Sequence, residues 1–159
     1  MLTEVIFKSY RVYCFDGADL RAARKKTGIS VKEFAKRMDW GASYQYGLER
    51  SEECTVTDKQ GDRIEKILQG MAVSDSWFKL VTRYRMNSKN LKIARMQTGL
   101  SQKRFADSMN WGLSYQARLE GGGVKTVSDE TAKSIVETLV AHGFNNLGRL
   151  GYDPGVLGD

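Results

Sequence analysis

The sequence predicts a mainly α-helical protein that is built from two tandem copies of one small unit. A shift of 71 residues places "MDWGASYQYGLE" (38–49) over "MNWGLSYQARLE" (109–120), with four differences in twelve letters. The alignment runs without a gap from 19–49 to 90–120, and further matches extend it to Leu68 and Leu139. Glycines and capping residues divide each copy into segments of helical length. A unit of roughly 60 residues is large enough for a small helical domain.

The first copy is expected to begin with two helices. Leu20 lies in the first helix, which ends at Thr27-Gly28 because glycine favours the position after a helix. Ser30 caps the second helix, and Glu33 three residues later completes the pattern of a capping box. The helical spacing of apolar residues places three of them on its inner face: Phe34, Ala35 and Met38.

Two further helices complete the first copy. Asp39-Trp40-Gly41 breaks the second helix, and a third is predicted over 42–49. After a polar loop, Thr57 or Asp58 starts a fourth helix. The second copy repeats this plan, with Ser101 as a cap, Asn110-Trp111-Gly112 as the turn, and Ser128 or Asp129 at the start of the last helix.

The segments before the two copies are "VIFKSYRVYCF" and "WFKLVTRYRM". Apolar and basic residues alternate in the second segment, which favours a short strand. Phe78, Val81 and Tyr84 also fit a helical stripe, so a helix is the alternative. The tail, 143–159, contains five glycines and the single proline, and is predicted to be irregular.

A helix, a tight turn and a second helix set at a steep angle form the geometry in which the second helix can enter the DNA major groove. The sequence therefore predicts two tandem helix-turn-helix domains of four to five helices each, with a short strand before each as an option. The expected boundaries are 1–70 for the first domain, 71–142 for the second, and 143–159 for a Gly-rich C-terminal tail.

The charge of the chain favours an anionic partner. Its net charge is +6 and its pI is about 9.3, which points to nucleic acid first and a membrane face second. Residues 1–70 hold 13 basic and 11 acidic residues, whereas residues 71–159 hold 12 and 8. Eight basic residues and no acidic one lie between Lys79 and Arg104, and we interpret this run as neutralising phosphates. An ordinary solvated face is the alternative.

The residue content argues against catalysis and metal binding. The chain has one histidine, His142, and two cysteines, Cys14 and Cys54, too few for a zinc set or a histidine-based triad. Carboxylates are scattered, and no glycine-rich phosphate loop stands in a suitable context. We therefore expect no enzyme activity, no cofactor and no metal. Without a signal peptide or a long apolar run, we expect a soluble, cytoplasmic protein with reduced thiols and no membrane partner.

The stretch "TGLSQKRFADSMNWGLSYQARLEGG" (98–122) resembles the Cro/repressor-type (XRE-like) helix-turn-helix family. In that family "GLSQ" opens the second helix and "S-Y-x-x-R-L-E" commonly ends the recognition helix. The first copy has Val31 where the family has Gln, and Gly47 where it has Arg. The residues that match in the second copy are Gly99, Leu100, Ser101, Gln102, Ala106, Ser114, Tyr115, Arg118, Leu119 and Glu120. Those that match in the first are Gly28, Ser30, Ala35, Ser43, Tyr44, Leu48 and Glu49.

Both copies depart from the family at the same two places. Gln45 and Gln116 stand where the family usually has Val or Ile, and Trp40 and Trp111 stand where it has a small aliphatic residue. We expect the tryptophans to fill a core position with a larger ring. For the glutamines two alternatives stay open, a hydrogen-bonded place in the core or a bidentate contact with adenine.

The resemblance implies a set of DNA contacts. Base-edge contacts are expected from the start of each recognition helix: Ala42, Ser43 and Tyr46 in the first copy, and Leu113, Ser114 and Arg118 in the second. Phosphate contacts are expected where the second helix of each copy opens: Ser30 and Lys32, then Ser101, Gln102 and Lys103. Tyr44 and Tyr115 are assigned to phosphates or to the core. A phosphate contact is the alternative for Arg118.

The predicted function is that of a sequence-specific regulator of transcription that binds double-stranded DNA, acting as a repressor by occupying its operator. Three pairs of changed residues on the recognition helices predict related but unequal half-sites. The alternative is a helix-turn-helix fold reused as a protein-binding inhibitor or anti-activator. A homodimer of the whole chain also stays open.

Overall fold

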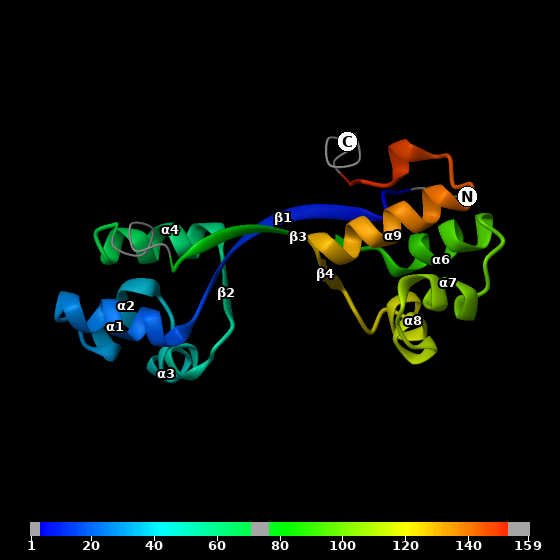
Figure 1. Ribbon diagram of the computed structural model, residues 1–159. Helices are drawn as coiled ribbons and strands as arrows, with labels where there is room; N and C mark the ends of the chain where they lie inside the picture. The colour runs from blue at the N-terminus through cyan, green and yellow to red at the C-terminus, as the bar shows by residue number, and fades with distance from the viewer. Residues whose placement is uncertain (1–3, 71–76, 153–159) are drawn as a thin grey trace. The chain divides into compact units, whose positions relative to one another are not determined.

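The computed structural model describes residues 4–70 and 77–152 of the chain (Figure 1). The chain divides into two compact units, each described here by itself. The 11–81 unit comprises Arg11–Val81. The 82–159 unit comprises Thr82–Asp159 together with Met1–Tyr10, so the beginning of the chain belongs to the unit that contains its end.

The first copy of the repeat forms the helices of the 11–81 unit. The Ser30 side chain caps α2 by accepting a hydrogen bond from the Glu33 N–H, as predicted, while the Glu33 carboxylate pairs with Arg37. The complete capping box lies instead at Thr57 and Gln60, at the start of α4. The elements in chain order are β1 (Phe7–Phe15), α1 (Gly17–Thr27), α2 (Val31–Met38), α3 (Ala42–Arg50), β2 (Cys54–Thr57) and α4 (Asp58–Ile67).

The second copy forms the helices of the 82–159 unit. Ser101 and Ser128 cap α7 and α9 with their side chains. The elements in chain order are β3 (Lys79–Met86), α6 (Ser88–Gln97), α7 (Gln102–Met109), α8 (Leu113–Glu120), β4 (Thr126–Ser128), α9 (Asp129–Ala141) and the short 3-10 helix η1 (Leu147–Arg149). The strands β1 and β3 occupy the two segments before the copies, where a short strand was expected as an option, and only the second of these segments showed alternation.

The prediction of a mainly α fold made of two tandem helix-turn-helix domains is wrong, because the chain is a mixed α and β protein. The described strands form a four-stranded sheet with the order β2-β1-β3-β4. The β1–β2 pair is antiparallel with Tyr13 opposite Val56, and the β3–β4 pair is antiparallel with Tyr84 opposite Val127. β2 and β4 were expected to be loops, because strands of four and three residues with one valine each give little alternation to detect.

Each long strand crosses from one unit to the other. β1 begins in the 82–159 unit and ends in the 11–81 unit, and β3 runs from the 11–81 unit into the 82–159 unit. The division expected from the sequence, 1–70 and 71–142, therefore differs from the compact units. The part of the 143–159 tail that the structure describes also differs from expectation, since Phe144, Leu150 and Tyr152 are buried in the core of the 82–159 unit.

Each unit has its own hydrophobic core, completed by a residue from the start of a long strand. Phe7 at the start of β1 packs in the core of the 82–159 unit, where its ring lies 5.9 Å from that of Tyr84. Phe78, just before β3, packs in the core of the 11–81 unit, where its ring stacks 4.4 Å from that of Tyr13. The 71-residue shift relates these two pairs to each other. Throughout residues 4–70 and 77–152, every helix is too short or too polar to cross a membrane.

Candidate nucleic-acid interface

Each unit presents a pair of short helices joined by a tight turn. The turn after α2 depends on Asp39, whose backbone is left-handed with a φ of 60°, and Asn110 takes the same conformation after α7 with a φ of 58°. Asp and Asn adopt this conformation more readily than most residues. The difference between Asp39 and Asn110 therefore preserves the turn. The next N–H donates back into the helix in each copy, from Trp40 to Ala35 and from Trp111 to Ala106 at 3.0 Å.

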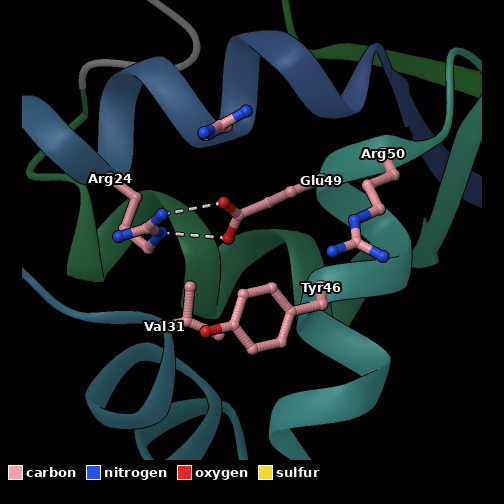
Figure 2. Close-up of a pocket in the computed structure, with 6 residues that line it drawn as sticks. Arg24, Val31, Tyr46, Glu49 and Arg50 are labelled. Carbon is pink, nitrogen blue, oxygen red and sulfur yellow. Dashed lines mark hydrogen bonds and ion pairs between the residues drawn. The ribbon is translucent and has the colours of Figure 1, made fainter.

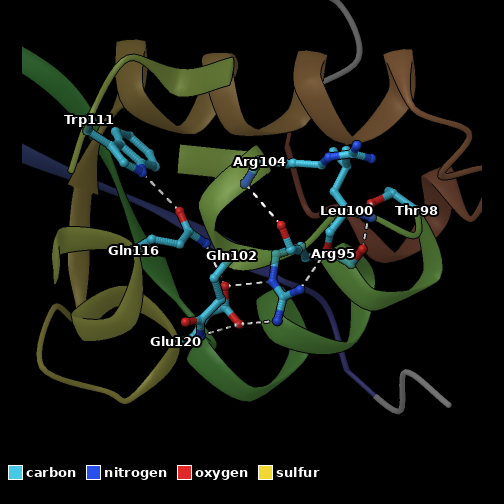
Figure 3. A network of polar contacts seen from close by, with 9 residues as sticks. Arg95, Thr98, Leu100, Gln102, Arg104, Trp111, Gln116 and Glu120 are labelled. Carbon is cyan, nitrogen blue, oxygen red and sulfur yellow. Dashed lines mark hydrogen bonds and ion pairs between the residues drawn. The ribbon is translucent and has the colours of Figure 1, made fainter. Parts of the chain in front are cut away.

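A buried chain of polar side chains holds α8 in the 82–159 unit (Figure 3). The indole N–H of Trp111 donates to Gln116 Oε1 at 2.9 Å, and the Gln116 amide donates to Glu120 Oε2 at 2.6 Å. Arg95 on α6 binds both oxygens of Glu120, at 2.8 and 2.9 Å. Its remaining nitrogen donates to the carbonyl of Leu100 at 2.7 Å, just before α7. One network thus joins α6, the turn and α8.

The 11–81 unit contains the same network at the positions related by the 71-residue shift. Trp40 donates to Gln45 at 2.9 Å, and Gln45 donates to Glu49 at 2.7 Å. Arg24 binds both oxygens of Glu49 at 2.9 Å and the carbonyl of Ile29 at 2.8 Å. The polar residues of this network are therefore part of the scaffold, and they occur twice because both units need the scaffold.

The network places both glutamines in the core. Gln45 and Gln116 are 0% exposed, and their amides are engaged on both sides. Of the two alternatives for these residues, the geometry supports the hydrogen-bonded core and leaves no surface for a base. The two departures from the family pattern also explain each other, because the indole N–H of each tryptophan needs the acceptor that the glutamine supplies.

The acidic end of the network keeps its negative charge. Burial raises the pKa of Glu120, but hydrogen bonds from Arg95, Gln116 and Gln102 outweigh it, so its pKa lies below the ordinary value. The Glu120 side chain is only 2% exposed. A buried ion pair needs such complete partnering, because removing one partner leaves an uncompensated charge that costs about 3–5 kcal/mol. The network therefore fixes α8 in one position.

The residues expected to contact bases lie on the outer surface of α3 and α8. Ser43 and Tyr46 are exposed, and Ala42 at the start of α3 is half-buried. In the 82–159 unit the equivalent surface comprises Leu113, which is 49% exposed, together with the exposed side chains of Ser114 and Arg118. Both sets are accessible, and the buried network lies beneath each of them.

Tyr44 and Tyr115, which were assigned to phosphates or to the core, lie at the boundary between the core and the surface. Tyr44 is exposed and meets the Trp40 ring edge-on, with 4.8 Å between the ring centroids. Tyr115 is half-buried and meets Trp111 in the same way at 4.9 Å. Each tyrosine ring covers a half-buried tryptophan that packs against the core. A tyrosine in this position can support the core and also contact a phosphate.

The residues expected to contact phosphates lie at the starts of α2 and α7. The hydroxyls of Ser30 and Ser101 are used in capping, and both residues are exposed. Lys32 and Lys103 are also exposed, whereas Gln102 is half-buried and donates to Glu120 at 3.3 Å. Each start therefore offers backbone N–H groups and one lysine to an anion.

Not every residue of the basic run from Lys79 to Arg104 is free to neutralise a phosphate. Arg95 is withdrawn into the buried network, and the Arg85 guanidinium lies 5.1 Å from the Tyr10 ring. The remaining positions are spread over β3, α6 and α7. Sequence reasoning missed the role of Arg24, Glu49, Arg95 and Glu120, although a repeat signal was present, since both Arg–Glu pairs survive the 71-residue shift.

The residues that the structure describes contain no group of three or more His, Cys, Asp or Glu side chains that could hold a metal ion. Cys14 and Cys54 are not joined in a disulfide. No protein-family model matches this chain, and neither a curated protein nor a solved structure matches it.

Proposed function

We propose that this protein is a sequence-specific regulator that binds double-stranded DNA through α3 and α8. The observation that carries the proposal is the contrast between the two sides of each helix. The buried side is fixed by an ion pair and an amide, whereas the outer side exposes small, apolar and basic side chains. Such a surface suits base reading, which needs side chains held in place by a rigid support. The likeness of 98–122 to the XRE-like family supports the same function.

The starts of α2 and α7 would position these helices on the duplex. An anion is favoured at a helix N-terminus, and Lys32 and Lys103 add a positive charge beside it. Such contacts fix register and orientation, whereas contacts from α3 and α8 supply the sequence information. The protein would then act as a repressor of bacterial or phage type in the cytoplasm, by occupying an operator and blocking polymerase. No enzyme activity is part of this proposal.

The two surfaces differ enough to read different sequences. Arg118 on α8 could bond a guanine through O6 and N7, and Leu113 could contact a thymine methyl. At the positions related by the shift, α3 has Gly47 and Ala42, and Tyr46 takes the place of Ala117. We therefore propose that the preferred DNA contains two unequal half-sites.

Selection from a pool of random duplexes tests the proposal. The full chain should enrich one asymmetric sequence, and the affinity for that sequence should fall steeply with salt. With about six phosphate contacts, the slope of log K against log salt should be near −5. A chain that enriches no sequence, and that binds no duplex at low salt, would overturn the proposal.

A second candidate function is protein binding through the same surfaces. Tyr44 and Tyr46 are both 47% exposed on one turn of α3, and exposed tyrosines are enriched at protein interfaces. The salt titration separates the two functions, because an interface centred on aromatic side chains depends on salt far less than phosphate binding does.

A further inference from the structure

A small cationic notch lies between α1, α2 and α3 of the 11–81 unit (Figure 2). Its volume is about 250 Å³, and it is lined by Arg21, Arg24, Val31, Tyr46, Glu49 and Arg50. In Figure 2 the paired Arg24 and Glu49 lie above the Tyr46 ring, and this ring lies between Val31 and Arg50. Two of the three helices that form the notch, α2 and α3, are those that would meet DNA under the proposed function.

One of the lining residues that differ between the two copies is Val31. Gln102 occupies the position of Val31 in the 82–159 unit, and its amide reaches Glu120 at 3.3 Å. Val31 is shorter and has no polar atom, so it cannot reach Glu49 in this way. The space that the Gln102 side chain takes in one unit is therefore left open in the other.

The charges around the notch favour an anion. Glu49 is neutralised by its two hydrogen bonds from Arg24, which leaves the positive charges of Arg21 and Arg50. Within residues 4–70 and 77–152 neither of these arginines forms an ion pair, and Arg50 lies over the Tyr46 ring at 5.8 Å. At the positions related by the shift, the 82–159 unit has Lys92 and Gly121, so this pair of arginines belongs to one unit alone.

The size of the notch restricts the ligand. Sites for drug-sized molecules usually have about 300–1,000 Å³, which is more than the notch provides. A single phosphate group fits, and the guanidinium group is the side chain best suited to bind it through two parallel hydrogen bonds. A whole nucleotide or a larger metabolite is too large to be enclosed.

We propose that this notch binds one phosphate group of the DNA backbone, clamped between Arg21 and Arg50 with Tyr46 against it. This phosphate clamp, formed by Arg21, Arg50 and Tyr46, rests on the proposed function and adds one backbone contact to it. The 11–81 unit would grip the backbone with this pair of arginines in addition to the bases that α3 reads, whereas the 82–159 unit has Lys92 and Gly121 at these positions. Free inorganic phosphate has the same chemistry, so the test separates the two sources.

In the first arm of the test, inorganic phosphate is added to the full chain. Its binding is measured by the shifts of backbone amide signals in NMR. Phosphate should perturb Val31 and Tyr46. Arg21→Ala/Arg50→Ala should weaken that binding by about tenfold or more, as expected for the loss of charge-assisted hydrogen bonds. Val31→Gln should also weaken it, because the new amide can fill the notch without removing a charge. If both variants bind inorganic phosphate as tightly as the wild type, the notch is not the phosphate site.

The second arm uses a duplex of scrambled sequence. Arg21→Ala/Arg50→Ala should bind it more weakly, with a salt slope shallower by about 1, the loss of one phosphate contact. The control is Lys59→Ala/Lys66→Ala, which removes two exposed charges from α4 of the same unit and should leave the slope unchanged. If the arginine variant loses inorganic phosphate but keeps the control's affinity and slope for DNA, the clamp on DNA is overturned. If the wild-type chain binds no duplex, the proposed function fails, and the first arm still decides whether the notch binds phosphate.

Discussion

Phe7 packs edge-on against Tyr84 with 5.9 Å between their ring centroids, although the sequence places them in different copies of the repeat. The converse pair, Phe78 with Tyr13, stacks at 4.4 Å in the other unit. Each unit therefore completes its core with an aromatic ring that the alignment assigns to the other copy.

This exchange predicts that a substitution near the N-terminus destabilises the unit that contains the C-terminus. Phe7→Ala should cost the 82–159 unit about 3–5 kcal/mol, the usual range for removing a buried Phe side chain. Amide hydrogen exchange should show lost protection in α6 and α9, and little change in α1 and α4. Phe78→Ala should give the reverse pattern. Leu80→Ala is the control, because Leu80 on β3 is exposed. Equal loss of protection throughout the chain would contradict the exchange.

Two helical glycines should respond to alanine in opposite ways. A Cβ at Gly47 in α3 would meet no atom within 4 Å, so Gly47→Ala should stabilise the protein by up to about 1 kcal/mol through helix propensity. At Gly61 in α4 a Cβ would lie 2.0 Å from the Tyr13 ring, so Gly61→Ala should destabilise it by about 1–3 kcal/mol. Urea unfolding measures both changes. A Gly61→Ala chain as stable as Gly47→Ala would show that the Tyr13 ring moves at no cost.

The lowered pKa of Glu120 predicts a loss of stability in acid. The folded carboxylate holds its proton less tightly than the unfolded one, so its contribution is complete above the unfolded pKa of about 4.3. It is lost as the pH falls through the lower folded pKa. The free energy of unfolding should thus fall less on acidification in Glu120→Gln than in the wild type. Glu137→Gln, at an exposed position on α9, should follow the wild-type curve. Parallel curves for wild type and Glu120→Gln would contradict the prediction.

Arg118 and Lys103 should differ in how they affect DNA binding. Arg118→Ala should weaken binding to the selected sequence by about 1–3 kcal/mol and relax the preference at one base position. Lys103→Ala should weaken the binding of all DNA sequences alike, because a phosphate contact carries no sequence information. Binding assays on the selected duplex and its single-base variants measure both. If both variants act uniformly, Arg118 contacts a phosphate.

The helices could be predicted from local signals, whereas β2, β4 and the pairing of the strands into a sheet could not. Ser30, Thr57, Ser101 and Ser128 cap helices where the sequence indicated, because a cap depends on residues within three positions of it. β2 and β4 depend instead on partners 39 or more residues away in sequence, such as Tyr13 for Val56. Nothing within such a short strand identifies its partner, so the sequence predicted a polar loop at these positions.

In the candidate site too, features set by nearby residues could be predicted, and features set by distant partners could not. The exposed positions on α3 and α8 follow from helix periodicity, and Ser43 and Ser114 are accessible as expected. The place of Gln45 and Gln116 stayed open, because a glutamine's partners come from the fold. The notch could not be predicted, since it depends on the difference in length between Val31 and Gln102 at a position buried by other helices.

The path of β1 also sets an order of events during synthesis on the ribosome. Phe7 is made 77 residues before Tyr84, which at typical translation rates is roughly 4–15 s earlier. Throughout that interval Phe7 on β1 and the adjacent Ile6 have no core to enter, because the unit that buries them is not yet made. Lys8 and Arg11 are exposed on the same strand. Positive charges on an unpaired strand oppose its association with other chains, so Lys8 and Arg11 are suited to keep this strand apart from other chains until its core partners are made.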